Sequence, residues 1–219
     1  MMFEVDMIYY VNDQNIDNRV LNRAKQIVEE GGIVACPTDT NFSIFCSPLS
    51  KRGIEKLKKL KGNNDSFTFT LFCYSISQIS DYAELNNRNF KYIKHYTPGP
   101  FVFILPTLQS TEKKINMKRK EIGVRITEST IVIELLKTLE NPLFGITASK
   151  EMSNSNWWDT VFADEHLFEF GWELEDIIDL DIIIDNDNGI EHSKILSTVV
   201  DLTKDEVVVL REGFYPFIE

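Results

Sequence analysis

Hydroxyl and charged side chains follow a predicted strand at the position where α/β proteins hold ligands. The apolar strand over 33–36 runs directly into Pro37-Thr38-Asp39-Thr40, which offers two hydroxyls and one carboxylate. Threonine hydroxyls and free backbone N–H groups suit a bound carboxylate or phosphate. The alternative is a turn in which Asp39 and Thr40 bond their own backbone.

Two cationic residues are candidates for binding an anion. Lys61 ends a basic helix just before Gly62 and Asn63, where a lysine can hold a polyphosphate as a point charge. The alternative is that Lys61 complements the negative end of its own helix. Arg125 lies in the apolar strand 122–126, which indicates either a buried ion pair or a contact with a substrate carboxylate or phosphate.

Polar groups recur at two later strand ends. Thr147 and Ser149 offer two hydroxyls facing one side, and Ser197 and Arg211 follow near the C-terminus. Each signal is weak alone, because the chain has no P-loop, no Gly-x-Gly-x-x-Gly and no nucleophile elbow. The three histidines and three cysteines show no zinc spacing, so no metal site is expected from them.

Charge is distributed unevenly along the chain. The net charge of −11 speaks against a general nucleic-acid binder, yet residues 1–150 carry 20 basic and 16 acidic side chains. Six bases cluster over 51–61 and six more over 113–125. An anionic ligand is therefore expected in the first two-thirds of the chain, and the alternative for each cluster is a solvated face.

Length and composition predict one globular domain spanning residues 1–219. The 219 residues suffice for a full core, and 43% of them are hydrophobic. No apolar run approaches the ~18 residues of a membrane span, and the N-terminus lacks the basic stretch of a secretory signal. The three cysteines lie in apolar stretches, which favours buried reduced thiols and a cytoplasmic protein.

Helical and strand patterns alternate along the chain, which predicts an α/β fold with a mixed sheet. Apolar residues at helical spacing predict helices over 16–28, 50–60, 75–83, 87–96 and 129–139. Short apolar or alternating runs predict strands over 33–36, 67–73, 101–105, 122–126, 143–147, 180–184, 197–202 and 206–210. The acidic, aromatic stretch 150–175 is expected to hold short helices.

Taken in order, these segments resemble the YrdC-like family of threonylcarbamoyl-AMP synthases over about residues 16–213. The runs that carry the resemblance are Gly-Gly-Ile-Val-Ala-Cys-Pro-Thr-Asp-Thr, Leu-Lys-Lys-Leu-Lys-Gly, Tyr-Thr-Pro-Gly-Pro-Phe, Gly-Val-Arg-Ile, Ser-Thr-Val-Val-Asp-Leu and Leu-Arg-Glu-Gly. The run Phe-Thr-Phe-Thr-Leu-Phe-Cys is most similar to the YciO branch. The resemblance implies an open twisted sheet with flanking helices around a concave basic cavity.

The resemblance also implies a reaction and its ligands. L-threonine, bicarbonate and ATP, with Mg²⁺, would give threonylcarbamoyl-AMP and pyrophosphate for the modification of tRNA. Thr38 and Arg125 would then bind substrate, while the nucleotide would be held by Lys61, Asn63, Thr147, Ser149, Ser197 and Arg211. Holding three anions together requires charge neutralisation more than covalent chemistry, which suits a cluster of bases.

Several positions depart from the family pattern. The usual Lys-x-Arg is Lys61-Gly62-Asn63, and Asp65 adds an acid nearby. Asparagine cannot replace a bidentate guanidinium, and one lost charge-assisted contact costs ~1.5–3 kcal/mol. Two alternatives therefore stay open: a weakly active or non-catalytic relative that binds nucleotide or RNA, and an enzyme acting on a different acid or adenylate.

Overall fold

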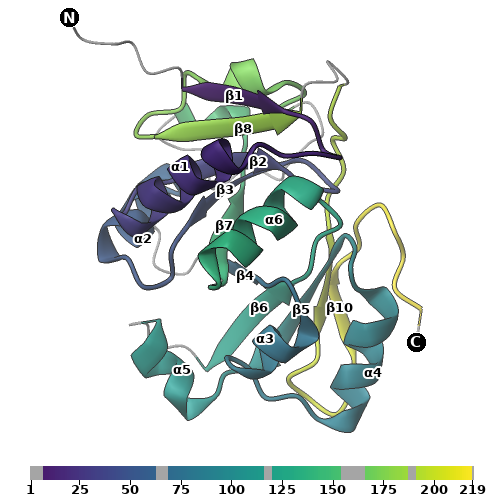
Figure 1. Ribbon diagram of the computed structural model, residues 1–219. Helices are drawn as coiled ribbons and strands as arrows, with labels where there is room; N and C mark the ends of the chain where they lie inside the picture. The colour runs from purple at the N-terminus through teal and green to yellow at the C-terminus, as the bar shows by residue number, and fades with distance from the viewer. Residues whose placement is uncertain (1–6, 63–68, 116–119, 154–165, 187–190, 219) are drawn as a thin grey trace, which may run out of the picture.

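The computed structural model describes residues 7–62, 69–115, 120–153, 166–186 and 191–218 and contains one mixed sheet (Figure 1). Its strands lie in the order β1-β8-β2-β3-β7-β4-β6-β5-β9-β10. Their bounds are β1 Ile8–Val11, β2 Val34–Pro37, β3 Phe42–Cys46, β4 Thr70–Phe72, β5 Phe101–Pro106, β6 Glu121–Arg125, β7 Leu143–Thr147, β8 Ile182–Asn186, β9 Thr198–Asp201 and β10 Val208–Arg211.

Both parallel and antiparallel pairs occur in the sheet. β1, β8 and β2 pair in parallel, as do β4 with β6 and β5 with β9, whereas the remaining neighbours are antiparallel. The α-helices are α1 Asn18–Glu29, α2 Lys51–Leu60, α3 Ile76–Ser80, α4 Asn87–Tyr96, α5 Gln109–Lys114 and α6 Thr130–Leu139. Two short 3₁₀ helices follow, η1 Lys150–Ser153 and η4 Gly171–Leu174.

Capping side chains mark where the main helices begin. Asp17, Ser50 and Ser129 each accept a hydrogen bond from a backbone N–H of the first turn of α1, α2 and α6, respectively. Such caps satisfy donors that have no partner inside the helix. Gly62 follows α2 with a φ of 69°, a left-handed conformation that glycine adopts readily, so the chain turns away directly after Lys61.

Apolar side chains cover both faces of the sheet and form two core clusters. On one face α1 and α6 pack against each other and against β2, in the upper part of Figure 1. On the other face α2 packs against β3, and residues of α3 and α4 join the same larger cluster. β2 and β3 are buried at every residue because helices cover both of their faces.

Most of the predicted elements are confirmed, with boundaries shifted by a few residues. The helix predicted over 87–96 matches α4, whereas the helix predicted over 75–83 is the shorter α3. β1, β3 and α5 were not predicted from the sequence pattern. Part of the strand predicted over 67–73, and residues 154–165 of the stretch 150–175, lie outside the described residues.

Candidate functional site

A cavity of about 280 Å³ lies on the same face of the sheet as α1 and α6, over strands that these two helices do not cover. Alternation along each strand creates it: in β6, Gly123 and Arg125 line the cavity, while Ile122 and Val124 belong to the core behind it. The lining comes from seven strands, the end of α2 and the residues beside them: Ser43, Lys61, Phe69, Thr70, Phe72, Val102, Ile104, Glu121, Gly123, Arg125, Gly145, Ile146, Thr147, Ser197, Val199 and Arg211.

Glycines in β6 and β7, the strands on either side of β4, keep this space open. A Cβ atom placed on Gly145 would lie 2.6 Å from the Phe72 ring, and one on Gly123 would lie 3.2 Å from Val102. A strand interior ordinarily disfavours glycine, unless another group approaches the backbone closely. The two glycines therefore hollow the floor of the cavity without breaking the sheet.

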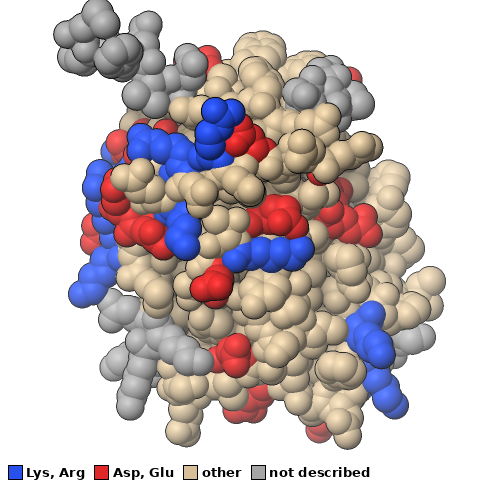
Figure 2. All heavy atoms as spheres, in the orientation of Figure 1, with Lys and Arg blue, Asp and Glu red and all other residues tan. Residues whose placement is uncertain are grey.

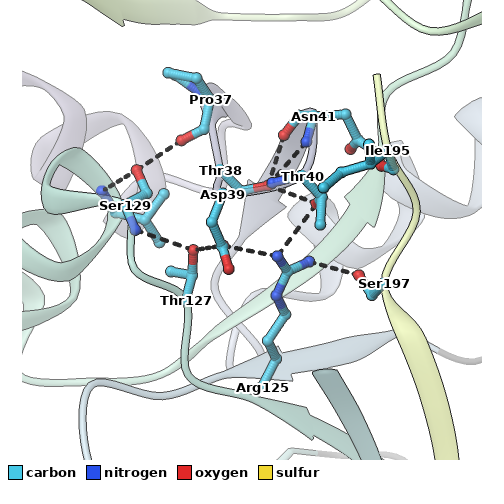
Figure 3. Close-up of polar contacts among 11 residues, drawn as sticks. Pro37, Thr38, Asp39, Thr40, Asn41, Arg125, Thr127, Ser129, Ile195 and Ser197 are labelled. Atoms are coloured by element: carbon cyan, nitrogen blue, oxygen red, sulfur yellow. Dashed lines mark hydrogen bonds and ion pairs between the residues drawn. The ribbon is translucent and has the colours of Figure 1, made fainter. Parts of the chain in front are cut away.

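Arg125 is buried at the centre of a polar network above this floor (Figure 3). Its Nη2 donates to Asp39 Oδ1 at 2.7 Å and to Thr40 Oγ1 at 3.2 Å, and its Nη1 donates to Ser197 Oγ at 2.8 Å. Thr127 donates its hydroxyl proton to the same oxygen of Asp39. Burial lowers the pKa of Arg125, and Asp39 opposes that change. Of the two sequence interpretations, the buried ion pair is therefore present.

The Thr38 hydroxyl is used inside its own turn. Its Oγ1 donates to the carbonyl of Asn41 at 2.6 Å and accepts from the backbone N–H of Thr40. Thr38 does not line the large cavity; it lines a separate cavity of about 190 Å³ that also borders Asp39 and His192. The segment is a turn, but Thr38 makes the side-chain bonds to its backbone, whereas the side chains of Asp39 and Thr40, expected to do so, bond Arg125 instead. A substrate contact of Thr38 stays a prediction.

Lys61 lines the cavity and is 9% exposed. Burial, together with the charge of Arg211, lowers the pKa of Lys61 from 10.5 to about 8. The pKa of Arg211 is also lowered, by burial and by the charge of Arg125. The Nε of Arg211 donates to the carbonyl of Ser197 at 3.0 Å, which holds the guanidinium beside the cavity. Arg211 thus repels both Lys61 and Arg125, and a bound anion would relieve that repulsion.

The other lysines of α2 have a different role. Lys56 forms an ion pair with Asp181 at 2.5 Å, and Lys59 forms one with Asp179 at 2.7 Å. Figure 2 shows basic and acidic side chains interleaved over α1 and α2 at the left of the molecule. For Lys56 and Lys59, the interpretation of the basic cluster as a charged outer face is therefore confirmed. Lys61 differs because it lies at the cavity end of the helix.

The remaining predicted site residues separate into three groups. Thr147 and Ser197 line the cavity, whereas Ser149 is fully buried and is not part of its lining. Asn63 lies outside the described residues. The sequence did not point to Ser43, because β3 was not predicted, nor to Glu121, the one carboxylate among the described residues of the lining. The alternation of Phe42-Ser43-Ile44 is the signal that could have identified Ser43.

Metal-binding clusters and membrane-spanning helices are both absent from the described residues. Within the described ranges, no cluster of three or more His, Cys, Asp or Glu side chains has the arrangement of a metal site. No helix in the same ranges combines the length and apolar character required to cross a bilayer. The cavity thus presents cations, hydroxyls and apolar walls as its binding groups.

Comparisons with other proteins point to one family. The YciO protein of Escherichia coli K12 is 31% identical over 210 residues, covering 95% of this chain and 96% of YciO. The crystal structure of E. coli YciO superposes with a TM-score of 0.78 at 28% identity, covering 96% of this chain and 97% of that one. A threonylcarbamoyl-AMP synthase of Psychromonas ingrahamii is 29% identical over 132 residues, 59% of this chain and 69% of the synthase.

A more distant structure shares the fold. Sua5 of P. abyssi, crystallised with L-threonine, superposes with a TM-score of 0.75 at 23% identity and covers 95% of this chain and 58% of Sua5. Residues 26–213 match the sequence profile of the Sua5/YciO/YrdC family, described as "Telomere recombination". This match, together with the YciO alignment, shows that the chain belongs to the Sua5/YciO/YrdC family.

Proposed function

We propose that this protein is an ATP-dependent threonylcarbamoyl-AMP synthase, a single cytoplasmic domain over residues 1–219 that serves the threonylcarbamoyl modification of tRNA. The observation that carries the proposal is that three cationic side chains, Lys61, Arg125 and Arg211, line one cavity, where Arg211 repels the other two. Relatives named threonylcarbamoyl-AMP synthase, and a fold neighbour crystallised with L-threonine, support the choice of substrates.

The reaction forms two bonds, the first at the carbon of bicarbonate and the second at the α-phosphorus of ATP. The amine of threonine adds to the carbon of bicarbonate, and loss of water gives a carbamate. A carbamate oxygen then attacks the α-phosphorus of ATP, the bond to the β-phosphate oxygen breaks, and pyrophosphate leaves. The protein supplies position and charge rather than a nucleophile, because the carbamate itself is the attacking group.

Each predicted residue has a role in this scheme. Lys61 and Arg211 neutralise the phosphates, and Arg125, held by Asp39, fixes the wall on which the threonine carboxylate is bound. The hydroxyl groups of Thr147 and Ser197, which line the cavity, would orient the ligands, and ligand contacts of Thr38 and Ser149 stay predictions. Mg²⁺ would arrive on the phosphates of ATP, since Glu121 is the one carboxylate in the described lining.

A second candidate function is favoured by a specific residue. Asn63 stands where the synthases that this chain resembles carry arginine, so one bidentate phosphate ligand is missing. Arg125, in turn, is already paired with Asp39. A weakly active or non-catalytic relative that binds nucleotide or RNA, or an enzyme that acts on another acid or adenylate, would retain this cavity while losing rapid synthesis.

Restoring the guanidinium separates these candidates. We expect Asn63→Arg together with Asp65→Lys to increase threonylcarbamoyl-AMP formation roughly tenfold to a hundredfold. A charge-assisted contact contributes ~1.5–3 kcal/mol where it is made in the transition state. The measurement is mass-spectrometric detection of threonylcarbamoyl-AMP from ATP, threonine and bicarbonate, with parallel reactions that omit threonine.

Asn18→Arg is the control for the added guanidinium, because it places one arginine at the exposed start of α1, far from the proposed phosphate contact in sequence. It should leave the rate unchanged. If the parent makes no threonylcarbamoyl-AMP, and the double variant binds ATP more tightly yet also makes none, the synthase assignment is wrong and the second candidate replaces it.

A further inference from the structure

The large cavity carries unlike charges at its two ends. In β6, Glu121, Gly123 and Arg125 all line the cavity, because alternate residues of a strand share one face. Four residues of strand separate the Cα atoms of Glu121 and Arg125 by about 13 Å. Arg211 lies near Arg125, and the two guanidinium charges repel each other. The cations suit an anionic group at one end, and Glu121 faces whatever the ligand places at the other.

The floor between these two ends is open, and the wall beside it is apolar. Gly123 lies opposite Thr70 of β4 on one side and opposite Ile104 of β5 on the other. It has no side chain, so the backbone of β6 is open to the cavity beside Val102 and Ile104. Ligand sites combine apolar walls with a few placed polar groups that fix orientation. A flat ring can therefore lie on this floor, with Glu121 at its edge.

The Glu121 carboxylate has no hydrogen bond or ion pair with any residue that the structure describes. Glu121 is an exposed residue of the lining, so its carboxylate is open to a ligand. An ionised carboxylate accepts hydrogen bonds and donates none. The ligand group that binds beside Glu121 is therefore a hydrogen-bond donor.

ATP has two kinds of donor, the amine on the adenine ring and the hydroxyls of the ribose. The proposed reaction takes place at the α-phosphorus, which would lie near Arg125 and Arg211. The ribose adjoins this phosphate directly, whereas the adenine amine is at the far end of the nucleotide. A separation of about 13 Å along β6 therefore fits the amine better than the hydroxyls, with the adenine ring on the floor at Gly123.

We propose that Glu121 makes the cavity selective for adenine by accepting a hydrogen bond from the 6-amino group of the base. This role of Glu121 rests on the proposed function, since it requires phosphates bound beside Arg125 and Arg211. Hypoxanthine carries a carbonyl oxygen in place of that amine, so an inosine nucleotide would set an acceptor against the carboxylate. Two facing acceptors are both left unpaired, which costs more binding free energy than a lost apolar contact does.

Calorimetric titrations of ATP and inosine triphosphate into the parent and into Glu121→Gln test this role. The two nucleotides carry the same triphosphate and ribose, so the cations and any Mg²⁺ contribute equally to both affinities. We expect the parent to bind ATP at least about tenfold more tightly than inosine triphosphate. Glu121→Gln should reduce this preference below about twofold or reverse it, because the glutamine amide donates to the carbonyl oxygen of hypoxanthine.

Glu84→Gln is the matched control for the lost charge. Glu84 is exposed, and its backbone N–H donates at 2.8 Å to the carbonyl of Pro106, the residue opposite Glu121. It does not line the cavity, so Glu84→Gln should leave the preference for ATP unchanged. As a second probe, 2′-deoxy-ATP lacks one ribose hydroxyl. Its affinity relative to ATP should be the same in the parent and in Glu121→Gln.

Three results overturn the role of Glu121 while leaving the nucleotide site in place. They are equal binding of ATP and inosine triphosphate by the parent, a preference for ATP that Glu121→Gln retains in full, and a preference for ATP over 2′-deoxy-ATP that Glu121→Gln abolishes. The last would assign Glu121 to the ribose. If none of these nucleotides binds the parent, the proposed function is wrong, and the role of Glu121 is wrong with it.

Discussion

Replacing Arg125 by methionine should lower the free energy of unfolding by about 3–5 kcal/mol, since it leaves the buried carboxylate of Asp39 without its counter-charge. The Arg125 and Asp39 side chains are 4% and 9% exposed, so water cannot substitute for the missing partner. Two hydroxyls would lose their guanidinium contacts as well, on Thr40 and Ser197. Chemical denaturation at neutral pH measures the loss directly.

Two further variants show whether the ion pair itself is responsible. Arg125→Met with Asp39→Leu removes both charges and should be more stable than Arg125→Met alone, because no unpaired charge stays buried. Arg125→Lys keeps the positive charge but not the several N–H donors of the planar guanidinium. Its free energy of unfolding should therefore lie between those of the parent and Arg125→Met. A loss below about 1 kcal/mol for Arg125→Met would mean that the pair is solvated, contrary to its burial.

Replacing Lys61 by methionine should weaken ATP binding at pH 7 at least tenfold. It should also raise the free energy of unfolding of the unliganded protein below about pH 8. The pKa of Lys61 is lowered on folding, from 10.5 to about 8. Between these values the unfolded chain binds more protons, so the parent gains stability relative to Lys61→Met as the pH rises through this window. The free energy of unfolding of Lys61→Met should exceed that of the parent by on the order of 3 kcal/mol below pH 8, and this difference should be constant there.

Lys51→Met provides the matched control for this prediction. Lys51 is exposed in the first turn of the same helix and does not line the cavity. Its loss should change neither ATP affinity nor the pH dependence of unfolding by a measurable amount. If Lys61→Met binds ATP as well as the parent does, Lys61 is only the residue that ends α2 and does not bind phosphate.

Local sequence signals predicted the helices well because their causes are local. Ser50 and Ser129 cap α2 and α6, and the apolar spacing within each helix defines its buried face. β3 was harder to predict, since Phe42–Cys46 is short, buried on both faces and directly follows a turn. Such a run is not distinguishable from other buried segments until its neighbours β2 and β7 are known.

The site could be predicted in composition but not in geometry. Lys61, Arg125, Thr147, Ser197 and Arg211 were selected as binding residues, and they do line one cavity. The pairing of Arg125 with Asp39 joins residues far apart in the chain, so periodicity alone could not show which partner the arginine has. The burial of Lys61 likewise depends on surrounding strands, whereas its position after a basic helix suggested an exposed side chain.

The most direct test of whether this cavity binds the phosphates of ATP is calorimetric titration of ATP into the parent at pH 8. The titration is repeated in buffers with different ionisation enthalpies, so that proton uptake is measured. If phosphates bind beside Lys61, their charge raises its pKa, and the half-protonated lysine becomes fully charged. We therefore expect ATP binding to take up a fraction of a proton per molecule at pH 8, and this uptake should be lost in Lys61→Met at the same pH. Binding without proton uptake at pH 8, or no binding at all, would contradict the assignment of this cavity to the nucleotide.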